Sequence, residues 1–217
     1  MSEPSQIALP LSARAPAGAA QRIVVGEANA AVIEALQAPE RWPFHVAVLT
    51  GPPRSGKSLL GCWAQGLHGE ALEVIDDAET LDETALFHRW NAVQQGGTRE
   101  GGALLLIANR DGDHGGWRIT LPDLASRIGG SLQLEIGAPD DLMAGELILA
   151  HAEQRGLALS EGAVDYCVPR TTRSFAAIEA LVAAIDRISL ERQTPATMSV
   201  WRAALEALHG PEQQRLL

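Results

Sequence analysis

Lys57 and Ser58 close a Gly-x-x-x-x-Gly-Lys-Ser sequence that begins at Gly51. An apolar, largely β-branched run over residues 46–50 precedes it, and an apolar helical pattern starts at Lys57. This order of strand, glycine loop and helix is the setting that a phosphate-binding loop requires. Gly51 and Gly56 let backbone N–H groups surround a phosphate, and the helix adds the positive end of its dipole. We predict a nucleotide site in which Lys57 contacts the β- and γ-phosphates and Ser58 binds Mg²⁺; a glycine-rich turn without a ligand is the weaker alternative.

Two carboxylates, Asp76 and Asp77, end an apolar strand predicted to begin at Ala71. A buried strand that delivers aspartate at its carboxyl end can place a Mg²⁺ ligand and a water-orienting acid beside the phosphates. We assign Asp76 to Mg²⁺ and Asp77 to the water. The short side chain of Asp77 predicts slow hydrolysis, and the alternative is a solvated acidic turn.

Four further residues could contact other parts of a nucleotide. Asn109 follows a fully apolar strand over residues 103–108, where a polar side chain can sense the γ-phosphate, although asparagine also commonly begins a loop. Val24, Val25 and Gly26 could cover the adenine with apolar contacts and backbone polar groups. Core packing explains these three equally well.

Composition limits the class of protein. The chain has 217 residues, 46% of them hydrophobic and 20% charged, which is typical of a globular protein. Its net charge of −10 argues against a direct grip on nucleic acid, because phosphate neutralisation needs clustered Lys and Arg. No apolar run approaches 18 residues, no histidine has metal-ligand spacing, and the two cysteines form no C-x-x-C pair. We expect a cytoplasmic protein that does not enter membranes.

The first 22 residues are rich in proline and small side chains and predict a flexible tail. Within it lies a short apolar segment whose potential contact residues are Gln6, Leu9, Pro10 and Leu11. Such an extended segment suits capture by a partner groove, and it resembles the peptide with which bacterial proteins dock on the DNA polymerase sliding clamp. A chance apolar segment in a tail is the alternative.

The pattern of elements predicts an α/β fold built on a parallel sheet, followed by a small all-helical domain. We place the tail at residues 1–22, the nucleotide-binding α/β subdomain at 23–137 and a helical lid at 138–217. The lid is expected to contain four helices, beginning near residues 139, 160, 173 and 194.

Taken together, the sequence resembles the AAA+ module of the bacterial replication initiator DnaA, and most closely its short homologues of the Hda type. The stretches that carry the resemblance are QIALPL, GPPRSGKS, VIDDAE, ALFHRWN, LPDLASR, PDDLMA and TTRSF. The resemblance implies that Arg127 is an arginine finger for a neighbouring subunit's nucleotide. It also implies that Arg173 contacts bound nucleotide in cis. Without the resemblance, each arginine could equally form a salt bridge at a helix end.

The resemblance implies a negative regulator of replication initiation. Such a protein binds nucleotide, preferentially ADP, with Mg²⁺, docks on the DNA-loaded clamp and stimulates ATP hydrolysis by DnaA. It would be at most a slow ATPase, would meet DNA only indirectly at the nucleoid, and could form homo-oligomers. The alternatives are a non-hydrolysing clamp-bound adaptor and, less favoured, a stand-alone P-loop kinase.

One departure from the family concerns the sheet. Asp76 lies only 19 positions after Lys57 (76 − 57), where the family fits another strand and helix. In the AAA+ strand order that strand lies at the edge, so the sequence predicts a shortened sheet with an edge to be covered or paired.

Overall fold

The computed structural model describes residues 22–95, 102–109 and 117–209, and these form two compact units. The first is an α/β unit that starts at Glu27 and ends at Gly137. The second is a helical unit that combines residues 22–26 with the chain from Ala138 onward. The predicted clamp-binding residues Gln6, Leu9, Pro10 and Leu11 lie outside the described residues.

The α/β unit is built on a parallel sheet with the strand order β2-β3-β1-β4. The strands are β1 (Val46–Thr50), β2 (Leu72–Ile75), β3 (Ala103–Ile107) and β4 (Leu132–Glu135). All five residues of β3 and the first four of β1 are buried, as expected for central strands covered on both faces. Because the strands are parallel, the loops after β1, β2 and β3 all leave the sheet at the carboxyl ends of the strands. This carboxyl edge is distinct from the open side of the outer strand β2.

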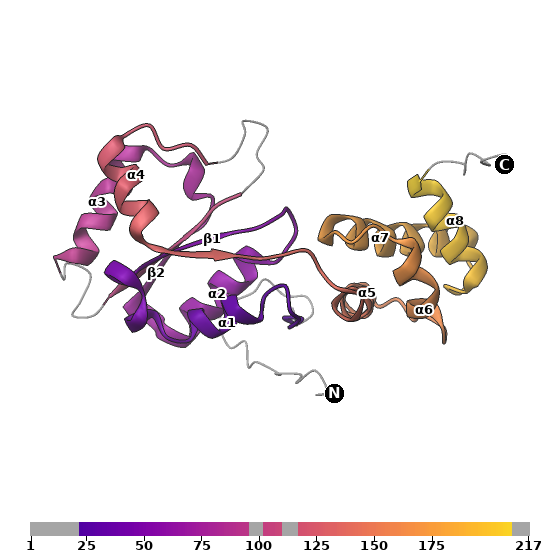
Figure 1. Ribbon diagram of the computed structural model, residues 1–217. Helices are drawn as coiled ribbons and strands as arrows, with labels where there is room; N and C mark the ends of the chain where they lie inside the picture. The colour runs from indigo at the N-terminus through magenta and orange to yellow at the C-terminus, as the bar shows by residue number, and fades with distance from the viewer. Residues whose placement is uncertain (1–21, 96–101, 110–116, 210–217) are drawn as a thin grey trace. The chain divides into compact units, whose positions relative to one another are not determined.

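Helices cover both faces of this sheet (Figure 1). On one face lie α1 (Ala30–Leu36) and α2 (Lys57–His68). Gly61 lets α2 pack closely on the sheet, because a Cβ at this position would lie 2.5 Å from Ile107 Cδ1. On the other lie α3 (Glu83–Gln94) and α4 (Pro122–Gly130). A buried apolar cluster joins α3 and α4 to the sheet through Val46, Val48, Leu86, Trp90, Leu104, Leu106, Leu124 and Ile128.

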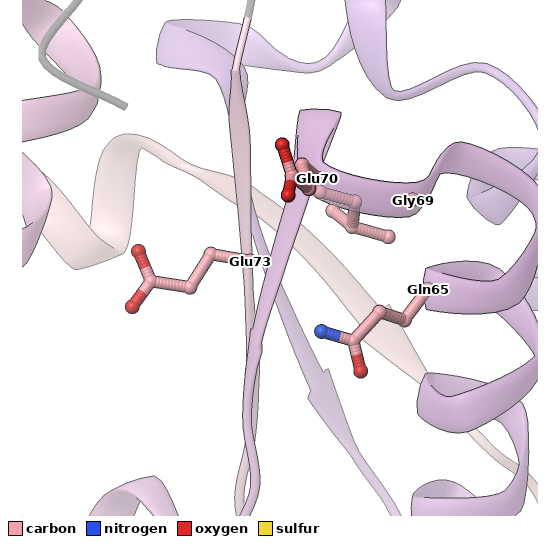
Figure 2. Close-up of a pocket in the computed structure, with 5 residues that line it drawn as sticks. Gln65, Gly69, Glu70 and Glu73 are labelled. Atoms are coloured by element: carbon pink, nitrogen blue, oxygen red, sulfur yellow. The ribbon is translucent and has the colours of Figure 1, made fainter. Parts of the chain in front are cut away.

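The sheet is short in the way the sequence predicts. Within the described chain β2 pairs with β3 alone, so its outer side is an open edge. A hollow of about 460 Å³ is lined by residues of α2, of the turn that follows it and of the start of β2: Gln65, Gly69, Glu70, Leu72 and Glu73 (Figure 2). The carboxylates of Glu70 and Glu73 make this lining unsuitable for phosphate, so the hollow is not the predicted nucleotide site.

The helical unit contains α5 (Asp141–Gln154), α6 (Ala163–Cys167), α7 (Phe175–Arg192) and α8 (Met198–His209). Side chains cap two of them: Asp140 accepts a hydrogen bond from the Met143 N–H at 2.7 Å, and Ser174 accepts one from the Ala177 N–H at 3.1 Å. Residues of all four helices form one buried cluster. None of the described helices is long and apolar enough to cross a membrane.

Two helices of this unit begin later than expected. The last starts at Met198 and not near residue 194, because Ala196 forms a bridge with Leu159 and accepts a 2.7 Å hydrogen bond from the Trp201 indole. The second starts at Ala163 after Gly162, whose φ of 81° is left-handed. Short 3₁₀ turns complete the two units at Pro39–Arg41, Pro43–His45, Gly69–Ala71, Ala78–Thr80 and Val168–Arg170.

Candidate nucleotide site

The loop between β1 and α2 has the form of a phosphate-binding loop. It leaves β1 after Thr50, and α2 begins at Lys57 with Gly56 as its N-cap. Gly56 has a φ of 84°, a conformation that glycine adopts without strain. The first N–H groups of an α-helix have no intrahelical acceptor, so this end of α2 offers donors and a positive dipole to an anion.

Lys57 lies inside this loop, with only 8% of its surface exposed. Its ammonium donates hydrogen bonds to the carbonyls of Gly51 and Pro52, both at 3.0 Å. Burial lowers the pKa of Lys57, and the negative charges of Asp76, Glu79 and Asp77 oppose that shift. Among the described residues, the hydrogen bonds of this buried ammonium thus go to two neutral carbonyls, and an anionic ligand would stabilise its charge.

Ser55, in the same loop, was not singled out from the sequence. It is buried, and its hydroxyl oxygen has no hydrogen-bond partner among the described residues. Buried hydroxyls without partners are rare, so each requires an explanation. A ligand oxygen beside Lys57 would accept a hydrogen bond from this hydroxyl, and the loop therefore fits a bound phosphate. The position of Ser55 just before Gly56 was the sequence signal that could have identified it.

The two aspartates follow β2 at the same edge of the sheet, and both are exposed. Asp77 has a left-handed φ of 50°, and its N–H donates to Asp76 Oδ1 at 3.0 Å. Ser58, in the first turn of α2, is also exposed. In the described part of the chain no three His, Cys, Asp or Glu residues form a group that could hold a metal ion. A cation here would therefore require ligand oxygens in addition to protein groups.

Asn109 comes two residues after β3, next to the loop. The preceding N–H, of Ala108, donates to the Leu49 carbonyl of β1 at 3.0 Å, which fixes this stretch beside the end of β1. The Asn109 carboxamide is bonded to Glu79, a residue of the 3₁₀ turn after β2 that the sequence reasoning passed over. The topology thus brings residues from three loops to one edge.

Arg127, in the last turn of α4, lies among side chains of its own unit. Its guanidinium donates to Asn91 Oδ1 at 2.6 Å and pairs with Asp123 at 3.1 Å. It also lies 4.6 Å from the ring centroids of both Phe87 and Trp90. With 29% of its side chain exposed, Arg127 is a half-buried link between α3 and α4.

The remaining predicted nucleotide contacts belong to the helical unit. Val24, Val25 and Gly26 are part of that unit, where Gly26 packs against Met143 so tightly that a Cβ would lie 3.0 Å from its side chain. Arg173 is exposed and forms a 2.9 Å ion pair with Asp141 at the start of α5.

Comparison of the whole chain with solved structures finds AAA+ proteins. Domain III of the replication initiator DnaA from Thermotoga maritima matches with a TM-score of 0.68 and 14% identity, covering 87% of this chain and 95% of that one. AMPPCP-bound DnaA from Aquifex aeolicus matches with a TM-score of 0.55 and 19% identity, covering 79% and 67%. The Thermotoga maritima RuvB Holliday junction branch migration motor matches with a TM-score of 0.59 and 13% identity, covering 85% and 70%.

The sequence itself matches no protein-family model and no curated protein. At identities below 20%, the structural matches establish the fold and not the activity. The strand order, the loop before α2 and these likenesses together identify an AAA+ fold with a shortened sheet, of the kind found in DnaA.

Proposed function

We propose that this protein is a nucleotide-bound AAA+ regulator of replication initiation that docks on the sliding clamp and stimulates ATP hydrolysis by DnaA. The observation that carries the proposal is the loop after β1, where a buried lysine and a partnerless serine hydroxyl meet the N-terminus of α2. The structural likeness to nearly the full length of DnaA domain III supports a role in replication initiation.

In this proposal the α/β unit binds ADP or ATP with Mg²⁺. Gly51 and Gly56 shape the loop, and Lys57 exchanges its two carbonyl partners for phosphate oxygens. Ser58 and Asp76 hold Mg²⁺ together with phosphate oxygens, while Asp77 orients water. The exposure of both aspartates and the short reach of Asp77 are consistent with slow hydrolysis by this chain itself.

The remaining nucleotide contacts follow the resemblance. Asn109 contacts the γ-phosphate and so senses whether it is present. Arg173 contacts the nucleotide from the helical unit. The adenine is covered by Val24, Val25 and Gly26. Arg173 can be recruited at small cost, because its ion pair with Asp141 is exposed and such pairs contribute at most about 1 kcal/mol.

Arg127 acts on the nucleotide of DnaA in trans. To do so its guanidinium must leave Asn91 and Asp123, and we propose that contact with DnaA drives that exchange. The tail segment with Gln6, Leu9, Pro10 and Leu11 binds the clamp, which brings the protein to DNA without a basic surface of its own.

Hydrolysis of DnaA-bound ATP tests the proposal, measured with clamp loaded on DNA, with and without the ADP form of this protein. We expect stimulation that requires the clamp and is lost when Leu9 and Leu11 are both changed to alanine. A matched control replaces Leu142 of α5, which is 77% exposed, with alanine. Absence of stimulation by a protein that binds both nucleotide and clamp would reject the regulatory role.

The contacts of Arg127 favour a second candidate, a non-hydrolysing adaptor. An arginine with two polar partners and two rings in its own unit is held for structure, and an adaptor needs no finger. An Arg127→Ala protein that folds, binds the clamp and stimulates DnaA like the wild type would remove the finger role. Clamp binding without any effect on DnaA would support the adaptor.

A further inference from the structure

The carboxylate of Glu79 makes an unusual contact at the candidate site. Its Oε1 accepts two hydrogen bonds from one residue: the Asn109 backbone N–H at 3.1 Å and the Asn109 side-chain Nδ2 at 2.7 Å. Glu79 belongs to the 3₁₀ turn after β2, and Asn109 follows β3, the neighbouring strand. One side chain therefore ties together two of the three loops at this edge.

The chemistry of the pair determines which way the Asn109 carboxamide faces. A carboxylate without its proton only accepts hydrogen bonds, so the NH₂ group and not the carbonyl must face Glu79. The backbone N–H bond to the same oxygen holds the main chain as well. One side-chain N–H and the carbonyl oxygen of Asn109 are left for other partners, in a fixed orientation.

The second oxygen of Glu79 also lacks a structural explanation. Oε2 is buried and has no hydrogen-bond partner within the described residues. Lys57 lies within electrostatic reach of Glu79, since the negative charge of Glu79 raises the pKa that burial lowers. A buried acceptor without a donor requires an explanation. A water molecule bound with the nucleotide would supply the donor, whereas a phosphate oxygen would not, because it also accepts.

We propose that Glu79 is a positioning residue of the nucleotide site, holding the Asn109 carboxamide so that the protein distinguishes a nucleoside triphosphate from a diphosphate. This inference rests on the proposed function of the loop as a nucleotide site. Glu79 itself need not touch the nucleotide. Its effect passes through Asn109, whose carboxamide, if free to rotate, would present donor and acceptor to the γ-phosphate without preference.

Two conservative substitutions separate position from charge. Glu79→Asp keeps the charge but draws the oxygens back by one methylene, so the bonds to Asn109 are lost. Glu79→Gln removes the charge but keeps an acceptor at the same reach. If positioning is the role, the aspartate variant is defective and the glutamine variant is close to the wild type.

The experiment measures dissociation constants of ADP and of the non-hydrolysable triphosphate AMPPCP, each with Mg²⁺, by calorimetry on the full chain. We expect Glu79→Asp to weaken AMPPCP relative to ADP about fivefold and Glu79→Gln to stay within about twofold of the wild-type ratio. Asn109→Ala should shift the ratio as Glu79→Asp does, and the double variant no further. Glu34→Asp and Glu34→Gln on the exposed side of α1 serve as matched controls.

Three results would contradict the proposal. An unchanged ratio in Glu79→Asp, a shift in Glu79→Gln alone, or effects of Glu79→Asp and Asn109→Ala that multiply would overturn the positioning role. The failure of the proposed function looks different, because the wild type would then bind neither nucleotide. A variant that loses both affinities equally, with a lowered melting temperature, would show a purely structural role.

Discussion

The two units of this protein differ in whether their buried polar side-chain atoms have hydrogen-bond partners. In the described residues, four buried side-chain atoms lack a hydrogen-bond partner: Ser55 Oγ, Trp63 Nε1, Glu79 Oε2 and Trp90 Nε1. All four belong to the α/β unit. In the helical unit the buried indole of Trp201 bonds to the Ala196 carbonyl. Within the described residues, the buried polar side-chain atoms of the helical unit are paired, whereas four in the α/β unit are not; two of these, Ser55 Oγ and Glu79 Oε2, lie in the loops of the candidate site.

This difference predicts that substitutions in the two units affect different quantities, the free energy of unfolding in one and the affinity for a ligand in the other. An unpaired buried polar atom costs about 1–3 kcal/mol, and at Ser55 a bound ligand oxygen would accept the missing hydrogen bond. Substitutions in the helical core should therefore act on unfolding, and substitutions at the loop after β1 should act on affinity.

The largest expected effect is on the helical core. Trp201→Ala removes a side chain that is 2% exposed, together with its indole hydrogen bond, and should lower the free energy of unfolding by about 3–5 kcal/mol. Denaturant unfolding followed by circular dichroism measures it. Replacing the exposed Leu190 of α7 with alanine is the control, expected to cost less than about 0.5 kcal/mol. Equal losses would show that the helical unit is not organised around this core.

Arg127 provides the second test, because it connects two helices of the α/β unit. Arg127→Ala removes the bond to Asn91 and the contacts with the rings of Phe87 and Trp90, and should cost about 1–2 kcal/mol of unfolding free energy. Arg127→Lys keeps the charge but not the planar group, so it should recover only part of the loss. Full stability in the alanine variant would contradict a structural role and strengthen the finger assignment.

Ser55 tests the meaning of a partnerless hydroxyl. Ser55→Ala removes no hydrogen bond, so stability should remain equal or rise slightly, while ADP affinity should fall about 3–10-fold, or ~0.7–1.4 kcal/mol. Ser131→Ala is the matched control, since that buried hydroxyl donates to the Arg127 carbonyl at 3.1 Å. It should lower stability and leave affinity unchanged. The reverse pattern would mean that Ser55 has no ligand.

The smallest expected effect is a pH dependence in the helical unit. Burial lowers the pKa of His151 from 6.5, with a smaller opposing effect from the negative charge of Glu179. The unfolded chain therefore binds a proton near pH 6.5 that the folded chain takes up only at lower pH. The stability contribution should be complete above pH 6.5 and fall as the pH drops toward the folded value. Melting temperatures from pH 7.5 to 5 should show a shallower slope in His151→Gln.

Much of the fold follows from local sequence. The apolar run before Gly51 and the helix start at Lys57 predict the loop geometry, because each depends on neighbouring residues. The short interval between Lys57 and Asp76 predicts the missing edge strand, because it leaves too little chain for another strand and helix. The helix start near residue 139 was predicted for the same local reason, since Asp140 caps α5.

Contacts between distant elements could not be predicted in this way. Glu79 and Asn109 are 30 positions apart, and their pairing depends on the neighbouring β2 and β3. The rings around Arg127 depend on the packing of α3 against α4. The start of α8 was misjudged because the bridge to Leu159, far back in the chain, keeps Ala196 extended.

Calorimetric titration of the full chain with ADP and Mg²⁺ tests the central claim, that the polar edge of the α/β unit is a nucleotide site. We expect one site per chain, weakened about 100-fold or more in Lys57→Ala, which is ~2.7 kcal/mol. That variant should fold normally, because in the part of the chain that the structure describes the hydrogen bonds of Lys57 go to two backbone carbonyls. A wild-type protein that binds no ADP, or binds it no better than Lys57→Ala does, would contradict the account.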